Sequence, residues 1–229
     1  MTEESKSIMD LGNDEEEKEA IISEKAARTL EVAGSAIFGA LSIIIGALLA
    51  PSIPRIAGWF IAIVDPISII WITAFLLFGV RAGIFTTLIG TVGLMPFDPT
   101  TWVGPSMKAA ATLSTMLVAI IALELYKRKA VVRSSKKLKR PRNYVIFGAL
   151  GLILRIFVMV ILNVLVFTTL YSSELNGITL EFLGLPDVTG ITAILVGAPL
   201  INLWQGAIDL LIPYLVVFGL NLDEKFQIW

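Results

Sequence analysis

The chain has 229 residues and a formal net charge of −1; 56% of its residues are hydrophobic and only 16% are charged. A soluble domain carries about 25% charged residues, so this composition and the mean hydropathy of +0.83 indicate a membrane protein. The absence of cysteine and histidine excludes disulfides, thiolate catalysis, imidazole bases and the usual zinc ligands. We therefore expect no metal, no cofactor and no nucleic-acid partner.

Residues 1–31 form an acidic segment in front of the first apolar stretch. They include ten acidic and four basic residues. A secretory signal needs a basic start and an early apolar core, and this segment has neither. We expect a cytoplasmic tail that is disordered at its beginning, with a short surface helix over 15–31 as an alternative for the rest.

Six predominantly apolar stretches follow the tail. A helix needs roughly 20 apolar residues to cross about 30 Å of hydrocarbon. The sequence predicts an all-α integral membrane bundle of six transmembrane helices, the second and third of them short and joined by a tight turn at 79–83. Their ranges are 32–54, 66–80, 82–97, 109–123 with an extension to 126, 144–171 and 188–222. One membrane domain, 32–222, would then lie between the acidic tail and a short C-terminal tail, 223–229.

The distribution of basic residues predicts the orientation. The segment 127–142 carries nine Lys and Arg residues and no acid, whereas the loops 51–65, 95–108 and 172–187 together hold two. The positive-inside rule places 127–142 in the cytoplasm. Counting helices in both directions then puts the N- and C-termini in the cytoplasm of a multi-pass protein of the cell membrane. The three loops rich in Pro, Gly, Trp and Asp would face outwards, and the first could be a re-entrant or lid segment.

Polar residues inside the apolar stretches are the candidates for a binding site. An ionised side chain at the centre of a bilayer costs about 2.5–3.5 kcal/mol on insertion scales. Asn202 and Gln205 are three residues apart, so they share one face of the last helix, and Asn163 lies on the fifth helix. Amides both donate and accept hydrogen bonds, which suits a neutral solute rich in heteroatoms. The alternative is that these amides only bond to neighbouring helices.

Five further residues could also contact a ligand. Trp59, Trp102 and Trp204 could stack on a flat ring, and Trp59 and Trp102 could instead be interfacial anchors. Asp65 and Lys108 could contact a ligand, although Lys108 could also extend to the outer interface. All five stay candidates at this stage.

Two other patterns concern the scaffold. Arg155 and Asp209 are the charges deepest in the last two helices, and we expect a structural ion pair between them. The first helix is rich in small residues, among which Ala36 and Ala40 have the small-xxx-small spacing that lets helices approach closely. That face would serve either internal packing or the docking of a separate membrane subunit.

In this order along the chain, these segments resemble the S component of energy-coupling factor (ECF) vitamin transporters. The resemblance covers roughly residues 32–222 and is nearest to the riboflavin-binding branch, whose last helix carries an Asn-Leu-x-Lys-Gly motif. Here the corresponding segment reads Asn202-Leu-Trp-Gln205-Gly206, so glutamine replaces the lysine. The other matching segments are Asp65-Pro66, residues 77–83, and residues 104–112 around Lys108.

The resemblance implies a fold, an activity and partners. An S component captures a vitamin or its precursor from outside, and it associates with a transmembrane coupling protein and two cytoplasmic ATPases. It is not an enzyme, and this chain has no phosphate-binding GxxxxGK[ST] loop. Asn202 and Asn163 would bind the ring of a riboflavin-like heterocycle, and Ala36 and Ala40 would form the docking face. The replacement at Gln205 exchanges a charged donor for a neutral amide.

Three other classes of function are compatible with a small membrane bundle. A stand-alone secondary transporter or channel is the first alternative, although no internal repeat of the kind found in such proteins is visible. An intramembrane enzyme would have to use Asp65 with Asp98, or Ser106 with Lys108, and neither set forms a known motif. A scaffold protein without a solute would have a solid interior between its last three long helices.

Overall fold

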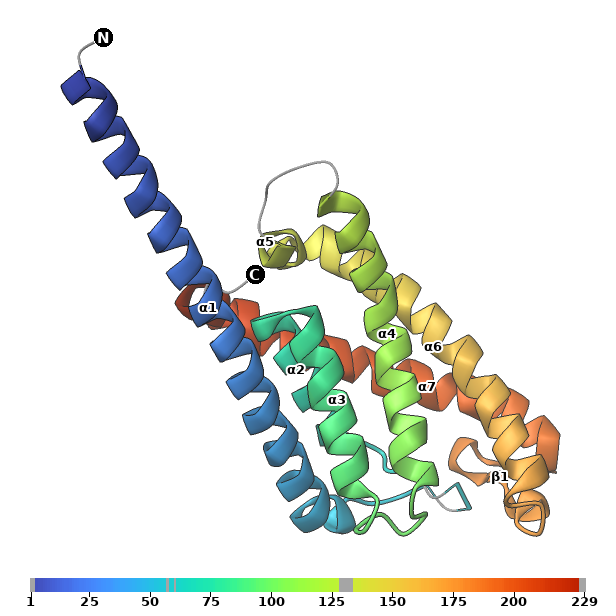
Figure 1. The fold of residues 1–229 in the computed structure, drawn as a ribbon. Helices are drawn as coiled ribbons and strands as arrows, with labels where there is room; N and C mark the ends of the chain where they lie inside the picture. Colours follow the sequence, from blue (N-terminus) through green and yellow to red (C-terminus); the bar gives the residue numbers. More distant parts are fainter. Residues whose placement is uncertain (1–2, 57, 60, 128–133, 227–229) are drawn as a thin grey trace.

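The computed structural model describes residues 3–56, 58–59, 61–127 and 134–226, and it describes side chains for 25–49, 51–56, 58–59, 61–125 and 137–226. The described chain is mostly helical. Its main helices are α1 (Glu3–Leu48), α2 (Pro66–Phe78), α3 (Val80–Leu94), α4 (Val103–Lys127), α6 (Pro141–Thr169) and α7 (Gly190–Tyr214). Figure 1 shows α1, α3, α4 and α6 following one another across the bundle, with α2 and α7 crossing behind them.

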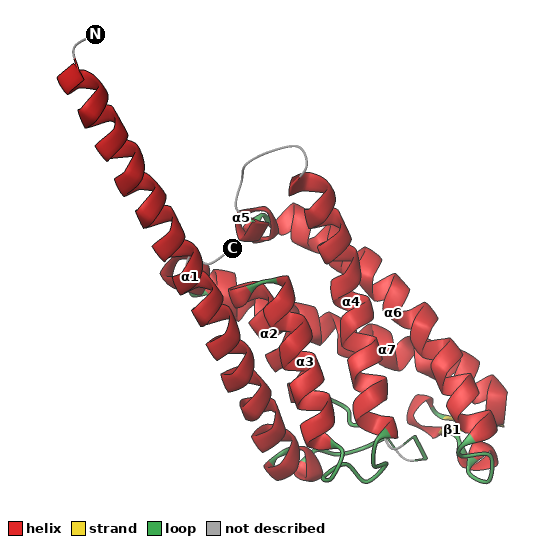
Figure 2. Ribbon diagram, in the orientation of Figure 1, coloured by secondary structure: helices red, strands yellow, loops and turns green. Residues whose placement is uncertain are grey.

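Short elements connect or extend these helices. They are η1 (Ala50–Ser52), α5 (Ser134–Lys139), η2 (Leu175–Gly177), β1 (Thr179–Leu180), η3 (Glu181–Leu183), β2 (Leu185–Thr189), the π-helical η4 (Leu215–Gly219) and α8 (Leu222–Phe226). The strands β1 and β2 pair antiparallel, with Thr179 opposite Thr189 and Leu180 opposite Leu185. Figure 2 shows most loops at the end of the bundle that carries β1, opposite α5.

Within the described residues, four helices are long and apolar enough to cross a membrane, at Lys25–Leu48, Val103–Leu125, Pro141–Thr169 and Gly190–Gly219. They indicate a membrane protein with an all-α bundle. The helices α2 and α3 have 13 and 15 residues. At 1.5 Å per residue they are about 20 and 22 Å long, which is less than the roughly 30 Å of a hydrocarbon core.

Helix α2 is the central element of the bundle. Ten of its 13 residues are buried, and it packs against α1, α3, α4 and α7. A helix that is apolar on all sides is stable only when it is surrounded, which explains why this short segment lies in the interior. Gly79 alone separates α2 from α3, with a φ of 101° that favours glycine.

Several boundaries differ from the predicted ones for local reasons. Helix α4 begins at Val103, six residues before the predicted span, because the Thr100 hydroxyl accepts a hydrogen bond from the Gly104 amide (2.8 Å) and caps the helix. Lys108 therefore lies inside α4. Helix α1 ends at Leu48 instead of residue 54. Helix α7 begins at Gly190 because β2 takes up the preceding residues.

The two predicted tails also have backbone structure. Helix α1 begins at Glu3, so residues 3–31 are helical and continuous with the first apolar stretch. Glu, Lys and Ala, which are good helix formers, are frequent there. Helix α8 includes the start of the predicted C-terminal tail, and residues 227–229 lie outside the described residues. Residues 128–133 of the basic segment also lie outside the described residues.

Helices α4 and α6 approach most closely at Gly151. A Cβ atom at this position would collide with the backbone carbonyl oxygen of Thr115. That oxygen is part of α4 and cannot rotate away. A Cβ at Gly148, one turn earlier, would meet only the end of the Leu210 side chain at 3.1 Å.

We therefore expect Gly151→Ala to destabilise the protein by about 1–3 kcal/mol, the range for overpacking, although alanine favours helix over glycine. Gly148→Ala on the same helix is the matched control and should change stability by less than about 1 kcal/mol. Thermal unfolding in detergent, followed by circular dichroism, measures both. An equal effect of the two substitutions would contradict the close approach of α4 and α6.

A candidate ligand cavity between the outer loops and the helices

A cavity of about 460 Å³ lies beside α2, α4, α6 and α7 and beneath the loops at the β1 end of the bundle. Most of its lining is apolar. Six of the predicted site residues border it: Trp59, Asp65, Lys108, Asn163, Asn202 and Gln205. The fold thus brings together residues that are up to 146 positions apart in the sequence, from Trp59 to Gln205.

Asp65 organises the side of the cavity formed by α2 and α4. As the N-cap of α2 it accepts a hydrogen bond from the Ile67 amide (3.1 Å), and Ser68 donates to its other oxygen (3.0 Å). The Lys108 ammonium lies 3.0 Å from Oδ1. Burial alone would raise the pKa of Asp65, but Lys108 and these hydrogen bonds outweigh it and hold the pKa below its usual value. Thr112 extends the chain by donating to Ser68 (3.0 Å).

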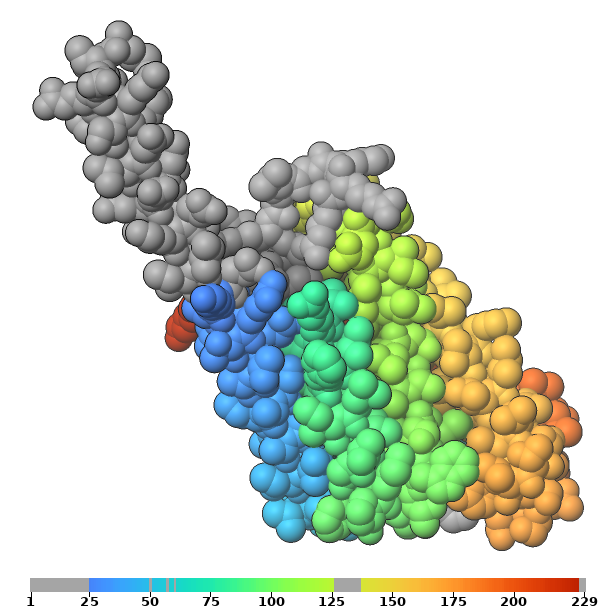
Figure 3. All heavy atoms as spheres, in the orientation of Figure 1, coloured from blue at the N-terminus to red at the C-terminus, as the bar shows by residue number. Residues whose placement is uncertain are grey.

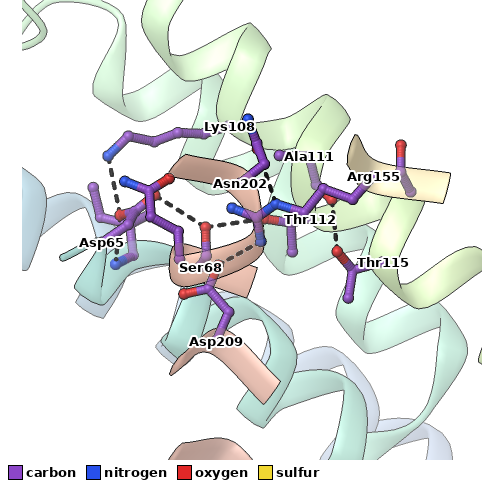
Figure 4. A network of polar contacts seen from close by, with 12 residues as sticks. Asp65, Ser68, Lys108, Ala111, Thr112, Thr115, Arg155, Asn202 and Asp209 are labelled. Atoms are coloured by element: carbon purple, nitrogen blue, oxygen red, sulfur yellow. Dashed lines mark hydrogen bonds and ion pairs between the residues drawn. The ribbon is translucent and has the colours of Figure 1, made fainter. Parts of the chain in front are cut away.

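The opposite side of the cavity is built around Arg155 of α6. Its Nη1 donates to Oδ2 of Asp209 on α7 at 2.6 Å, which confirms the expected ion pair, and its Nε donates to Oδ1 of Asn202 at 3.2 Å. All three side chains are buried. Figure 4 shows this group beside the chain of contacts from Lys108 through Asp65 and Ser68 to Thr112. Arg155 itself borders the cavity, so it is more than the scaffold feature that we expected.

Gln205 connects α7 to the first outer loop. Its Nε2 donates to the carbonyl oxygen of Ala62 at 2.5 Å, and the neighbouring Trp204 donates to the carbonyl oxygen of Ile63 at 3.2 Å. Within the loop, the Ile56 amide bonds to the Ile61 carbonyl (2.8 Å). The described residues of this loop therefore pair like a short hairpin, border the cavity and are held to α7 by two side chains.

Trp59 holds the same loop to the β-hairpin. Its indole Nε1 donates to the carbonyl oxygen of Thr179 at 2.8 Å, and its ring lies edge-on to Phe182. It packs against Gly197 of α7, where a Cβ atom would collide with the ring. Trp59 is only 1% exposed, so it is a wall of the cavity and a structural anchor at the same time.

The other two tryptophans do not reach the cavity. Trp102 is 55% exposed and Trp204 is 58% exposed, and neither belongs to the cavity lining. The position of Trp102 fits the interfacial role that the sequence left open, whereas Trp204 lies inside α7 and bonds to the Ile63 carbonyl. Asn163, by contrast, is buried at the cavity wall and donates to the Met159 carbonyl (2.7 Å).

The residues considered for catalysis are engaged in structural contacts. Asp98 borders the cavity, but its Oδ1 accepts hydrogen bonds from the amide and the hydroxyl of Thr100 (2.9 and 2.5 Å). Asp65 is held as described, and Ser106 does not border the cavity. Among the described residues, no group of acidic side chains could hold a metal ion.

Sequence reasoning missed several residues of the cavity wall, of which Arg155, Met159, Val166 and Phe167 lie on α6. Together with Asn163 they follow one another at intervals of four, four, three and one positions, which keeps them on one face of a helix. This spacing was visible in the sequence. Met107 of α4 and Tyr171, which follows α6, had no such signal.

The small residues of α1 divide between two faces. Gly34, Gly39 and Gly46 point inwards, where a Cβ would meet Phe78, Ile89 and Leu94 of α2 and α3. Ala36 and Ala40 are exposed. Internal packing therefore accounts for the glycines but not for these two alanines.

Comparisons with known proteins add no relative. No protein-family model, no curated protein and no solved structure matches the chain.

The buried position of Asp65 leads to a prediction with a defined pH dependence. Lys108→Met leaves the carboxylate without its counter-ion, so we expect a loss of about 2–3 kcal/mol at pH 7. This is less than the 3–5 kcal/mol for a fully buried pair, because Lys108 is 23% exposed. The wild-type contribution exists above the unfolded pKa of about 3.9 and is lost as the pH falls through the lower folded value.

The stability difference between wild type and Lys108→Met should therefore narrow as the pH falls, because the buried carboxyl group of the variant, without its counter-ion, takes up a proton at a higher pH than that of the wild type, whose pKa is lowered. Unfolding curves in detergent from pH 3 to 8 measure it. Lys108→Met combined with Asp65→Asn is the control, because it removes the isolated charge and should recover much of the loss. A difference that does not vary with pH would contradict the ion pair.

Proposed function

We propose that this chain is the substrate-capturing membrane subunit of an ECF-type importer. In this proposal it binds a vitamin or a related small heterocycle, riboflavin-like in the first place, from outside the cell. The chain itself catalyses no reaction, and two cytoplasmic ATPase subunits supply the energy through a transmembrane coupling protein. The order of the motifs from Asp65 to Gly206 supports the family, and the cavity supports the binding of a solute.

The observation that carries the proposal is the cavity wall. Ligand sites usually measure 300–1,000 Å³, are mainly apolar, and hold a few fixed polar groups. The cavity here has about 460 Å³, with the amides of Asn163, Asn202 and Gln205 on two facing helices. A scaffold protein would have no reason to keep such a space open between α4, α6 and α7.

The proposed topology has six membrane-spanning helices and cytoplasmic termini in the cell membrane. The described parts of the basic segment, Lys127 and residues 134–142, and the N-terminal part of α1 lie at the end of the bundle opposite the cavity (Figure 1), as the positive-inside rule requires of an outward-facing cavity. The shortness of α2 is compatible with this topology, because α2 begins at Asp65 on the cavity wall and the loop and cavity occupy the remaining depth.

Gln205 bears on the choice of substrate. In the riboflavin-binding branch a lysine at this position would present a charge to the ligand. Here the amide donates to the Ala62 carbonyl, so its donor holds the loop instead. The proposal therefore extends to heterocycles of similar size that need no charged partner at this point.

The protein purified in mild detergent should carry, or bind in the nanomolar range, a flat heterocyclic nutrient. Mass spectrometry of the extracted ligand and thermal shifts with a panel of vitamins measure this. Asn202→Ala should raise the Kd at least about tenfold, which corresponds to about 1.4 kcal/mol. Leu203→Ala, at an exposed neighbouring position, is the control and should leave the Kd unchanged.

Absence of a retained ligand together with absence of a shift for every vitamin would refute the proposed function. An unchanged Kd in Asn202→Ala would refute the role of this cavity but not the binding activity.

A second prediction concerns the coupling protein. The exposed alanines lie on α1, which Figure 3 shows at the edge of the bundle. Ala36→Trp with Ala40→Trp should leave ligand binding unchanged and abolish ATP-dependent uptake, because two bulky rings prevent a close helix contact.

Ile153→Trp with Phe157→Trp places two rings on an exposed face of α6 and serves as the control, with uptake expected to continue. Uptake in vesicles that contain the chain and its partners measures both. Undiminished uptake by the α1 variant would contradict docking at this face, and uptake by the chain alone would favour a stand-alone transporter.

A further inference from the structure

The orientation of the Asn202 amide is determined from two sides. Its Oδ1 accepts from Nε of Arg155 (3.2 Å), and its Nδ2 donates to the carbonyl oxygen of Ala198 (2.9 Å). A guanidinium N–H can only donate and a backbone carbonyl can only accept. The amide therefore cannot turn over without losing both bonds, and the N–H of Nδ2 that Ala198 does not use remains for a ligand.

Arg155 is fixed in the same way. Asp209 accepts from Nη1 at 2.6 Å and is completely buried, whereas Arg155 borders the cavity. The negative charge thus lies behind the guanidinium and not at the cavity surface. Because a guanidinium has five N–H donors and no acceptor, three donors remain beyond the two in these bonds, on a side chain that borders the cavity.

The wall on the side of α2 and α4 also presents mainly hydrogen-bond donors. Both oxygens of Asp65 already accept hydrogen bonds, from Ile67, Ser68 and Lys108. Lys108 has three N–H donors and no acceptor, and it borders the cavity. Gln205 adds an amide oxygen and the second N–H of Nε2, because Ala62 accepts only one. Donors therefore outnumber acceptors at this level of the cavity.

We propose that Arg155 is a positioning and specificity residue of the ligand site: held by Asp209, it locks the Asn202 amide so that this wall presents N–H donors and selects ligands with an acceptor edge. Such an edge consists of exocyclic carbonyl oxygens on the ring, in contrast to exocyclic amino groups. This inference rests on the proposed function and names the chemical class of its substrate.

Two probes of the same size test which of these two edges the site prefers. Pteridine-2,4-dione has carbonyl oxygens where 2,4-diaminopteridine has amino groups, and the ring skeleton is otherwise identical. The Kd of each is measured by titration calorimetry with the full chain in nanodiscs at pH 7.5. The wild type should bind the dione at least about tenfold more tightly than the diamine.

The test variant is Arg155→Met with Asp209→Leu. Replacing both members of a buried ion pair with apolar residues of similar volume is often tolerated, whereas removing one member leaves an isolated charge. Without the Nε–H of Arg155, only the bond to the Ala198 carbonyl still orients the Asn202 amide, so turning the other end to the ligand costs one hydrogen bond instead of two. The preference for the dione should fall below about threefold. A residue that only stabilises the fold would weaken both probes equally and leave the ratio unchanged.

The control is Lys139→Met, which removes an ion pair with Asp223 and Glu224 far from the cavity and should keep the wild-type ratio. Size-exclusion profiles and helical content verify that each variant is folded. Equal or reversed preference in the wild type, or an unchanged ratio in the double variant, would overturn this proposal while leaving the proposed function intact. Binding of neither probe by the wild type would also overturn it, and the vitamin panel decides the proposed function separately.

Discussion

The ion pair between Arg155 and Asp209 constrains how α6 and α7 face each other. Two charges inside an apolar bundle are tolerated only when they are paired and hydrogen-bonded, and this pair joins the two helices at 2.6 Å. Gly206 makes room for it, because a Cβ there would lie 3.4 Å from Nη1 and would collide with Leu152. The rotation of α7 that brings Asp209 to Arg155 also turns Asn202 and Gln205 towards the cavity.

The polar residues around the cavity lie between two apolar clusters. One cluster surrounds Phe75 and Leu123 and includes Val217 and Phe218, beyond the end of α7. The other surrounds Trp59 and joins α6 and α7 to the β-hairpin. These clusters hold the ends of the bundle together, so the side chains between them can be arranged around an open space without loss of the fold.

The sequence predicted the helices better than it predicted the loops. Long apolar stretches identify helices by composition alone, and the deep charges of Arg155 and Asp209 had few possible partners except each other. The start of α4 depended on a capping bond from Thr100, which composition does not reveal. The shortness of α2 and α3 was visible, but the central position of α2 follows from packing against four helices and not from its own residues.

The candidate site was predictable where polarity marked it. Asn163, Asn202 and Gln205 stand out because amides are rare in apolar helices. Trp59 and Trp102 were indistinguishable in the sequence, since both are loop tryptophans. Only the tertiary contacts of Trp59 with Thr179 and Gly197 separate it from the exposed Trp102. The use of Gln205 as a tether to Ala62 likewise depends on the path of a loop far away in the chain.

The single-residue connection at Gly79 has a mechanical consequence. The amide of Gly79 bonds to Phe75 in α2, and its carbonyl accepts from Gly83 in α3, each at 3.0 Å. The one-residue connection leaves little room for α2 and α3 to slide along each other. Asp65 at the cavity and the α3 surface against α1 therefore lie on one helix pair whose relative register is fixed at Gly79.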